Sequence, residues 1–283
     1  MTTSRLAVLA VVLTLSGCKK KEEAVVEPPK PEVVVAKPEP VVEKPVAKPA
    51  EPVKPLFAWW ERNKANELIV PEDKNKPVEN PKAYTRAFCE KSGPLKIEFT
   101  GRQAGDPEKL DTGMPLDIEV NGDDMGGLKF KVVEGTYKDS ERICLIVDDA
   151  FAKDLTQVEL KSGEVDCTAE QKKLVAPMLK GTKTCRQQAA GADVFSYELE
   201  SKDNSGVALL FPTSKIFVEL GDPEGEYGAA VMDLVVVLKR ADGTYLAVTC
   251  NMSHESITTS LNVVGKSALE EQTSILYYNA AGG

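Results

Sequence analysis

Apolar and polar side chains alternate along most of the chain that follows residue 93. Leu95, Ile97 and Phe99, for example, are separated by single polar residues. A two-residue period is typical of a strand with one buried and one solvated face, whereas a continuous apolar run favours burial on both faces. The segments with one of these two patterns are 95–100, 116–120, 128–132, 143–147, 194–200, 207–211, 215–220, 234–238, 244–251, 257–264 and 273–278.

Two short helices are expected among these strands. The first begins at Asn80, with Pro81 in its first turn, and ends before Gly93-Pro94. The second is capped by Thr168, because Gln171 follows three residues later as in a capping box. Many short strands with two helices predict a mainly β fold, either an antiparallel β-sandwich or an α+β domain. The expected apolar faces of the helices are Tyr84, Ala87 and Phe88 in the first and Leu174, Val175 and Met178 in the second.

The N-terminal residues carry a different pattern. Arg5 precedes an apolar run over residues 6–15, and the run ends in Leu15-Ser16-Gly17-Cys18. Ten helical residues span about 15 Å, half of the ~30 Å core of a bilayer, so we expect a secretory signal rather than a membrane span. The final four residues resemble the lipobox of bacterial lipoproteins. This resemblance implies that residues 1–17 are a signal peptide and that Cys18, the first residue after cleavage, carries the lipid.

The residue after this cysteine bears on the expected location. In lipoproteins, an aspartate there usually retains the protein in the inner membrane, and this chain has Lys19 instead. We therefore expect a lipid anchor in the outer membrane, facing either the periplasm or the cell surface. Two or three acyl chains hold a protein stably, whereas a single chain is marginal. The alternative is an ordinary cleaved signal followed by a coincidental cysteine.

Residues 18–55 are expected to form the lipidated N-terminus and a disordered spacer. Between Lys19 and Pro55 there are nine prolines, nine valines, eight lysines and seven glutamates, with no glycine and no aromatic residue. Proline fixes φ and favours the extended polyproline II conformation. The spacer is therefore expected to be stiff, with a length on the order of 110 Å when fully extended. A proline-rich ligand for a partner groove is the alternative.

Composition excludes several classes of function. The chain has 283 residues and a net charge of −9, and the part from Leu56 onward holds 26 basic and 37 acidic residues, a net charge of −11. An acidic surface argues against a nucleic-acid partner, which requires basic side chains. The single histidine removes most zinc chemistry, and no metal or other cofactor is expected.

Five cysteines follow Cys18, and an exported chain can form disulfides between them. We expect Cys167 to pair with Cys185, because the two flank the second helix and a bridge would fasten both of its ends. Closing a loop of this size stabilises a fold by about 3 kcal/mol. Cys144 lies inside an apolar strand and is either a disulfide partner or a buried free thiol. The sequence leaves the pairing open for the three cysteines outside this pair, which are Cys89, Cys144 and Cys250.

Residues 56–82 are expected to connect the spacer to a β-rich globular domain over residues 83–283. This connection begins with an aromatic segment that contains both tryptophans, Trp59 and Trp60, and continues into a polar stretch. We expect the aromatic segment to be a strap that packs on the domain. The alternative is a partner-binding anchor, for which Trp59 and Trp60 are the candidate residues.

No catalytic constellation stands out. The lone His254 lies between two expected strands, next to a serine that would point to the opposite face, so we expect a surface histidine. Asp148 and Asp149 follow a buried strand, and Asp123-Asp124 lie among glycines; we expect turn residues at both places.

The sequence thus favours a membrane-anchored, non-enzymatic lipoprotein of the cell envelope. Its β-rich domain would bind or scaffold an envelope protein or polymer at a distance set by the spacer. One alternative is an extracytoplasmic hydrolase that uses Asp148 or Asp149 with a second carboxylate. Another is an assembly chaperone or inhibitor that uses an exposed sheet edge.

Overall fold

The computed structural model describes residues 53–60, 66–73, 76–103, 118–119, 125–136, 143–225, 228–254 and 256–279, of which 59–60, 73, 118–119, 125–126 and 276–279 are described by their backbone alone. All of them belong to one compact unit, Ala50–Gly283. The signal sequence, Cys18 and the spacer up to residue 52 lie outside the described residues.

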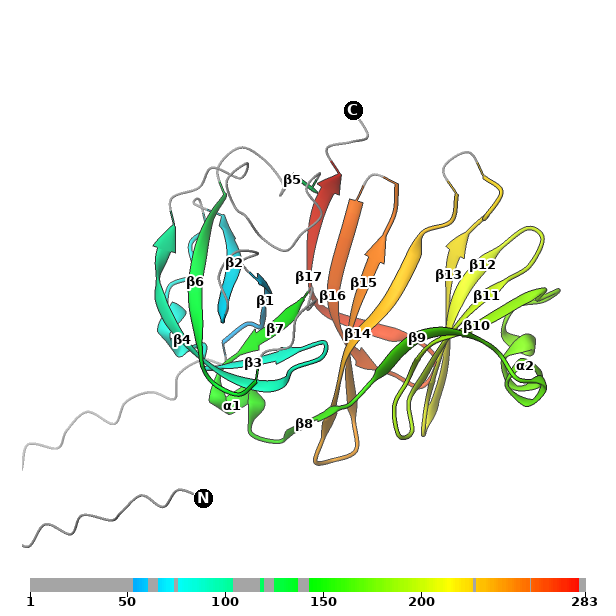
Figure 1. Ribbon diagram of the computed structural model, residues 1–283, viewed down its shortest axis with the longest axis horizontal. Coiled ribbons are helices and arrows are strands. Elements are labelled where there is room, and N and C mark those ends of the chain that lie inside the picture. The colour runs from blue at the N-terminus through cyan, green and yellow to red at the C-terminus, as the bar shows by residue number, and fades with distance from the viewer. Residues whose placement is uncertain are drawn as a thin grey trace, which may run out of the picture. The chain divides into compact units, whose positions relative to one another are not determined.

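Six antiparallel strands form a closed barrel in the order β1-β2-β6-β4-β3-β7 (Figure 1). The aromatic segment and the start of the polar stretch, which were expected to lead to the domain, supply β1 and β2. The interior is filled by side chains that alternate along the strands, such as Leu68 and Val70, and Leu128 and Phe130. The bounds are β1 Leu56–Trp60, β2 Glu67–Asp73, β3 Arg86–Cys89, β4 Gly93–Gln103, β6 Met125–Glu134 and β7 Cys144–Val147.

The expected helix after Asn80 is wrong beyond its first turn. Pro81–Ala83 form a single 3-10 turn, η1, and the chain then enters strand β3. In β3 the side chain of Ala87 faces the barrel interior and that of Phe88 packs outside the barrel. These neighbouring residues bury opposite faces, which a strand allows and a helix does not.

Two open antiparallel sheets follow the barrel. The six-stranded sheet has the order β5-β17-β16-β15-β14-β8, and the five-stranded sheet has the order β13-β12-β11-β10-β9. The bounds are β5 Ile118–Glu119, β8 Leu155–Val158, β9 Lys161–Asp166, β10 Thr184–Ala190, β11 Phe195–Glu200, β12 Ser205–Phe211, β13 Ser214–Gly221, β14 Val231–Arg240, β15 Tyr245–Met252, β16 Ser256–Val264 and β17 Leu269–Asn279.

Three apolar clusters join these parts into layers. Phe57 and Leu145, on the outer side of the barrel, pack against Val248 in the six-stranded sheet. The other face of that sheet packs through Val237 on Leu209 of the five-stranded sheet. Helix α2 (Ala169–Val175) packs on the remaining face of the five-stranded sheet. Sheets packed face to face, with only short helices, confirm the predicted mainly β fold class.

The helices are short. Helix α1 (Asp149–Ala152) follows β7, and α2 continues into one 3-10 turn, η3 (Ala176–Met178). The predicted capping box is present in α2, since the Thr168 hydroxyl accepts from the Gln171 amide and the Gln171 side chain accepts from the Thr168 amide. The prediction that Leu174 belongs to the buried side is wrong, because 44% of its surface is exposed. Within the described ranges no helix has the length and apolarity that crossing a membrane requires.

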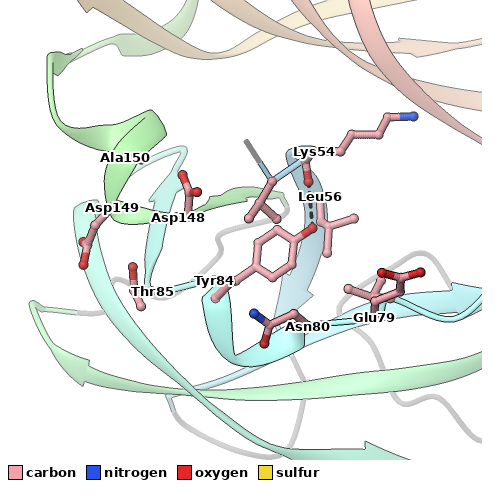
Figure 2. Close-up of a pocket in the computed structure, with 12 residues that line it drawn as sticks. Lys54, Leu56, Glu79, Asn80, Tyr84, Thr85, Asp148, Asp149 and Ala150 are labelled. Carbon is pink, nitrogen blue, oxygen red and sulfur yellow. Dashed lines mark hydrogen bonds between the residues drawn. The ribbon is translucent and has the colours of Figure 1, made fainter. Parts of the chain in front are cut away.

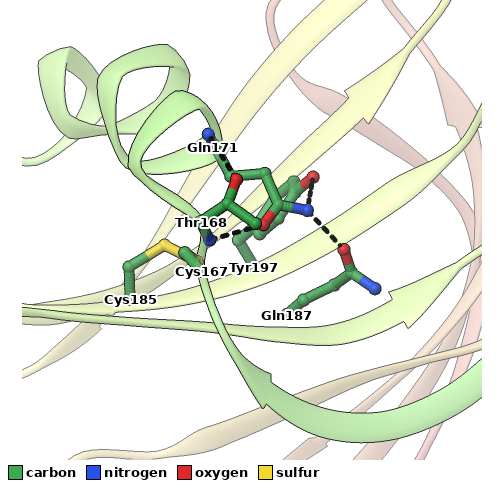
Figure 3. The surroundings of a disulfide bond; sticks show 6 residues. All are labelled: Cys167, Thr168, Gln171, Cys185, Gln187 and Tyr197. Atoms are coloured by element: carbon green, nitrogen blue, oxygen red, sulfur yellow. Dashed lines mark hydrogen bonds between the residues drawn. A yellow bond between two sulfur atoms is a disulfide. The ribbon is translucent and has the colours of Figure 1, made fainter.

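Two disulfides are present among the described residues. Cys167 and Cys185, the pair expected from the sequence, join the start of α2 to β10 (Figure 3). Cys89 and Cys144 lie directly opposite each other on β3 and β7 and form the second disulfide in the barrel core. Cys144 is therefore a disulfide partner, and Cys250 is the buried cysteine outside both bridges.

Candidate functional site

A pocket of about 680 Å³ opens at one end of the barrel (Figure 2). Three chain segments form its walls: the entry to β1, the segment around η1, and the start of α1. Its volume lies in the range of small-molecule sites. The lining residues are Val53, Lys54, Leu56, Val78, Glu79, Asn80, Ala83, Tyr84, Thr85, Asp148, Asp149 and Ala150.

Tyr84 joins the first wall to the barrel core. Its ring packs edge-on against Phe130, with the ring centroids 6.4 Å apart, and only 3% of Tyr84 is exposed. Its hydroxyl donates a hydrogen bond of 2.8 Å to the carbonyl oxygen of Lys54. Burial, with a further contribution from the Asp148 charge, raises the pKa of Tyr84 to about 12. Tyr84 therefore stays a neutral donor that holds the entering chain against the barrel.

A buried carboxylate fixes the second wall. Glu72, in β2, is 7% exposed and accepts a hydrogen bond of 2.7 Å from the backbone amide of Val78. Arg102 donates to the same carboxylate from Nε at 3.0 Å and from Nη2 at 3.3 Å, and Nη2 also donates to the Val78 carbonyl at 2.6 Å. Both backbone groups of Val78 are thus bound to one ion pair, which positions this side of the pocket.

The two aspartates of the third wall, Asp148 and Asp149, both form hydrogen bonds within the protein. Asp148 is the N-cap of α1 and accepts a hydrogen bond of 2.7 Å from the Phe151 amide. Arg86 donates from Nε to Asp149 at 2.7 Å, and this hydrogen bond holds the pKa of Asp149 below its usual value. A helix cap and an ion pair therefore account for these carboxylates, which fix α1 against β3.

The pocket combines apolar walls with a polar rim. Val53, Leu56 and Val78 also pack on the barrel core, so this side of the pocket is continuous with a rigid cluster. Glu79 and Lys54 are exposed at the rim. A concave surface with apolar walls and a few polar groups has the general character of a ligand site.

The other sequence candidates whose side chains are described do not line this pocket. Trp59 and Trp60 pair through their backbones with Ile69 and Leu68 in β2, and their side chains lie outside the described part. His254 is exposed in the turn between β15 and β16, as expected for a surface histidine. Cys18 and the pair Asp123-Asp124 also lie outside the described residues.

The sequence interpretation named Asp148 and Asp149 but missed the other groups that build the pocket. Tyr84 was assigned to a helix face, and the Glu72–Arg102 ion pair joins residues 30 positions apart with no motif between them. Within the described ranges, no group of three or more histidine, cysteine, aspartate or glutamate side chains has a geometry that could hold a metal ion.

Comparison of the chain with protein-family models, with curated proteins and with solved structures gives no match.

Proposed function

We propose that this protein is a lipoprotein of the cell envelope, anchored in the outer membrane through acyl chains on Cys18, whose β-rich body binds or scaffolds an envelope partner. The observation that carries the proposal is the apolar run that ends in Leu15-Ser16-Gly17-Cys18. The spacer that follows would hold the body away from the bilayer.

Two disulfides support export from the cytosol. Reducing conditions in the cytosol keep most thiols from forming disulfides, whereas the periplasm and the cell surface are oxidising. The bridges Cys89–Cys144 and Cys167–Cys185 are both in the folded body. An exported chain with a cysteine directly after its signal sequence is what lipid attachment requires.

A binding role for the body is supported by the pocket. Its two adjacent aspartates are occupied by a helix cap and by an ion pair. Binding an envelope protein or polymer requires only such a pre-formed surface, whereas the hydrolase alternative requires two carboxyl groups placed to act together on one bond.

Mass spectrometry of the mature N-terminus tests the anchor. The protein is produced in cells that process lipoproteins, and we expect its first residue to be Cys18 carrying the mass of two or three acyl chains. The variant Cys18→Ser is expected to lose both the added mass and membrane attachment, whereas Cys250→Ala keeps both. A mature chain that begins elsewhere, or that leaves membranes in plain buffer, contradicts the proposal.

Cross-linking in intact cells tests the binding role. We expect a cross-linked partner that is lost in Ala83→Trp, because this substitution fills the pocket. Ala268→Trp places the same side chain at an exposed turn and serves as the matched control. A cross-linking pattern that is identical in the two variants contradicts a role for the pocket.

A further inference from the structure

Charged side chains are segregated between the two faces of the five-stranded sheet. Acidic side chains outnumber basic ones at the margin of the face toward the six-stranded sheet, where Glu164, Glu198 and Glu200 surround Arg186. Arg186 lies 3.8 Å from Glu164. Burial raises the pKa of Glu198 on this face, and the charges of Glu164, Glu200 and Asp233 add to the effect while Arg186 opposes it. The opposite face, which α2 covers in part, has a different character.

Lysines dominate the face that carries α2. In β13, Ile216 and Val218 pack toward the six-stranded sheet, so Lys215 and Glu219 project on the α2 side. The exposed charged residues of α2, of the segment between α2 and β10, and of this side of β13 are Lys172, Lys173, Lys180, Lys183 and Lys215 against Glu170 and Glu219. Five lysines face two glutamates here, although the chain from Leu56 onward has a net charge of −11. We call this surface the α2 face.

Exposed apolar side chains accompany the lysines. Four large apolar side chains are exposed in the described residues, and two of them, Val165 at 61% and Leu174 at 44%, lie on the α2 face. Val165 is the cross-strand neighbour of Gln187, whose side chain accepts a hydrogen bond of 2.8 Å from Gln171. Gln171 is in turn about one helical turn before Leu174. Val165 and Leu174 therefore both neighbour the hydrogen-bonded pair Gln171–Gln187.

The α2 face is held rigidly. The Cys167–Cys185 disulfide fixes the start of α2, and the capping box and the Gln171–Gln187 contact orient its first turn (Figure 3). A partner that binds here therefore meets side chains on a fixed frame, and little backbone ordering is required on binding.

We propose that the α2 face binds an anionic lipid surface. Lysines near a bilayer are attracted by acidic headgroups, and exposed apolar side chains on the same surface gain by entering the boundary between headgroups and acyl chains. Solvated lysines alone would suit any polyanion, and the exposed Leu174 and Val165 favour lipid. This inference rests on the proposed envelope location, because an anchored body has a bilayer within reach.

Sedimentation with vesicles tests this inference without using the acyl anchor. The protein used is the chain from residue 18 with Cys18→Ser, which retains the whole folded body and carries no lipid. We expect it to bind vesicles that contain phosphatidylglycerol, to bind vesicles of phosphatidylcholine alone much more weakly, and to be released by added salt. Because acylation plays no part, a failure here leaves the test of Cys18 acylation unaffected, and the reverse also holds.

Paired variants identify the face. Each lysine near an anionic surface changes the partition coefficient roughly fivefold, so Lys172→Gln with Lys173→Gln is expected to lower it about 25-fold. Leu174→Ser is expected to lower it about fivefold. The matched controls are Lys131→Gln with Lys153→Gln and Val231→Ser, which change equally exposed side chains on other elements and are expected to leave binding unchanged.

Two results overturn the proposal. One is equal loss of binding in the lysine variant and in its control, which would make the attraction a property of overall charge. The other is loss with the lysine variant but none with Leu174→Ser, which would assign the face to a soluble or cell-wall polyanion instead of lipid.

Discussion

Removing the Cys89–Cys144 disulfide is expected to destabilise the body more than removing the Cys167–Cys185 disulfide. The two residues are 55 positions apart, and the chain-entropy relation gives about 4 kcal/mol for a loop of this size. For Cys167–Cys185, with a separation of 18, the same relation gives about 3 kcal/mol. Both cysteines of the barrel disulfide are 0% exposed, so alanine is the better replacement because it buries no new polar group.

Urea unfolding measures this difference. Both tryptophans are in β1, which pairs with β2 and with β7, the strand that carries Cys144. Tryptophan fluorescence therefore comes from a strand of the barrel. We expect Cys89→Ala with Cys144→Ala to lower the free energy of unfolding by about 4 kcal/mol.

Two further variants separate the covalent link from packing. Cys167→Ala with Cys185→Ala is expected to cost about 3 kcal/mol. Cys250→Ala removes a buried sulfur but no bridge and is expected to cost about 1 kcal/mol. If the barrel double variant costs no more than Cys250→Ala, the stabilising role assigned to loop closure is refuted.

Substitutions at three other residues have defined outcomes. Tyr84→Phe removes the hydrogen bond to the Lys54 carbonyl and is expected to lower the free energy of unfolding by about 1 kcal/mol in thermal melts, with the barrel core intact. Thr168→Ala removes the cap of α2 and is expected to cost about 1 kcal/mol in the same assay, whereas Thr168→Ser keeps the cap and costs less. Burial raises the pKa of Glu198 above its ordinary value of 4.5. The charged carboxylate therefore destabilises the folded state at pH values above 4.5. Glu198→Gln is therefore expected to stabilise the protein at neutral pH, and urea titrations should show this gain vanish as the pH falls below that value.

Many of the strands could be predicted from the sequence because their apolar pattern is local, whereas β1, β2, β3, β8, β9 and β10 were not predicted as strands. The apolar run at residues 143–147 predicted burial on both faces, and in β7 Leu145 packs outside the barrel while Ile146 fills its interior. The same holds for β14, where Val237 and Leu238 belong to clusters on opposite faces of the sheet. A two-sided burial pattern needs no knowledge of the partner, only that both faces are covered.

The prediction of a helix after Asn80 failed because it used only local sequence signals, whereas pairing with other strands decides the structure of this segment. Asn80 and Pro81 do begin a turn of 3-10 helix. The next residues form strand β3, which pairs with β7 and β4: Ala87 lies opposite Ile146 in β7 and opposite Leu95 in β4. Strand pairing between segments some 60 residues apart thus outweighs a short helix signal, as tertiary context commonly does.

The candidate pocket could not be predicted from the sequence. Its walls come from three segments that only the closed barrel brings together, and the groups that fix them act over long separations. Tyr84 reaches Lys54 across 30 positions, and Arg86 reaches Asp149 across 63. The same reasoning applies to the Cys89–Cys144 bridge, whose partners meet because β3 pairs with β7.

The arrangement of free sheet edges bears on how the body meets a partner. The closed barrel has no edge strand, whereas β9 is the last strand of the five-stranded sheet, and all six of its residues are exposed. The pairing of β9 with β10 contains a bulge, because two residues of β9 oppose the single residue Gln188. The side chains of Lys161, Glu164 and Asp166 add charges of both signs to β9. Bulges and charges on an edge hinder the addition of another strand. Addition of a partner strand at β9 is therefore disfavoured.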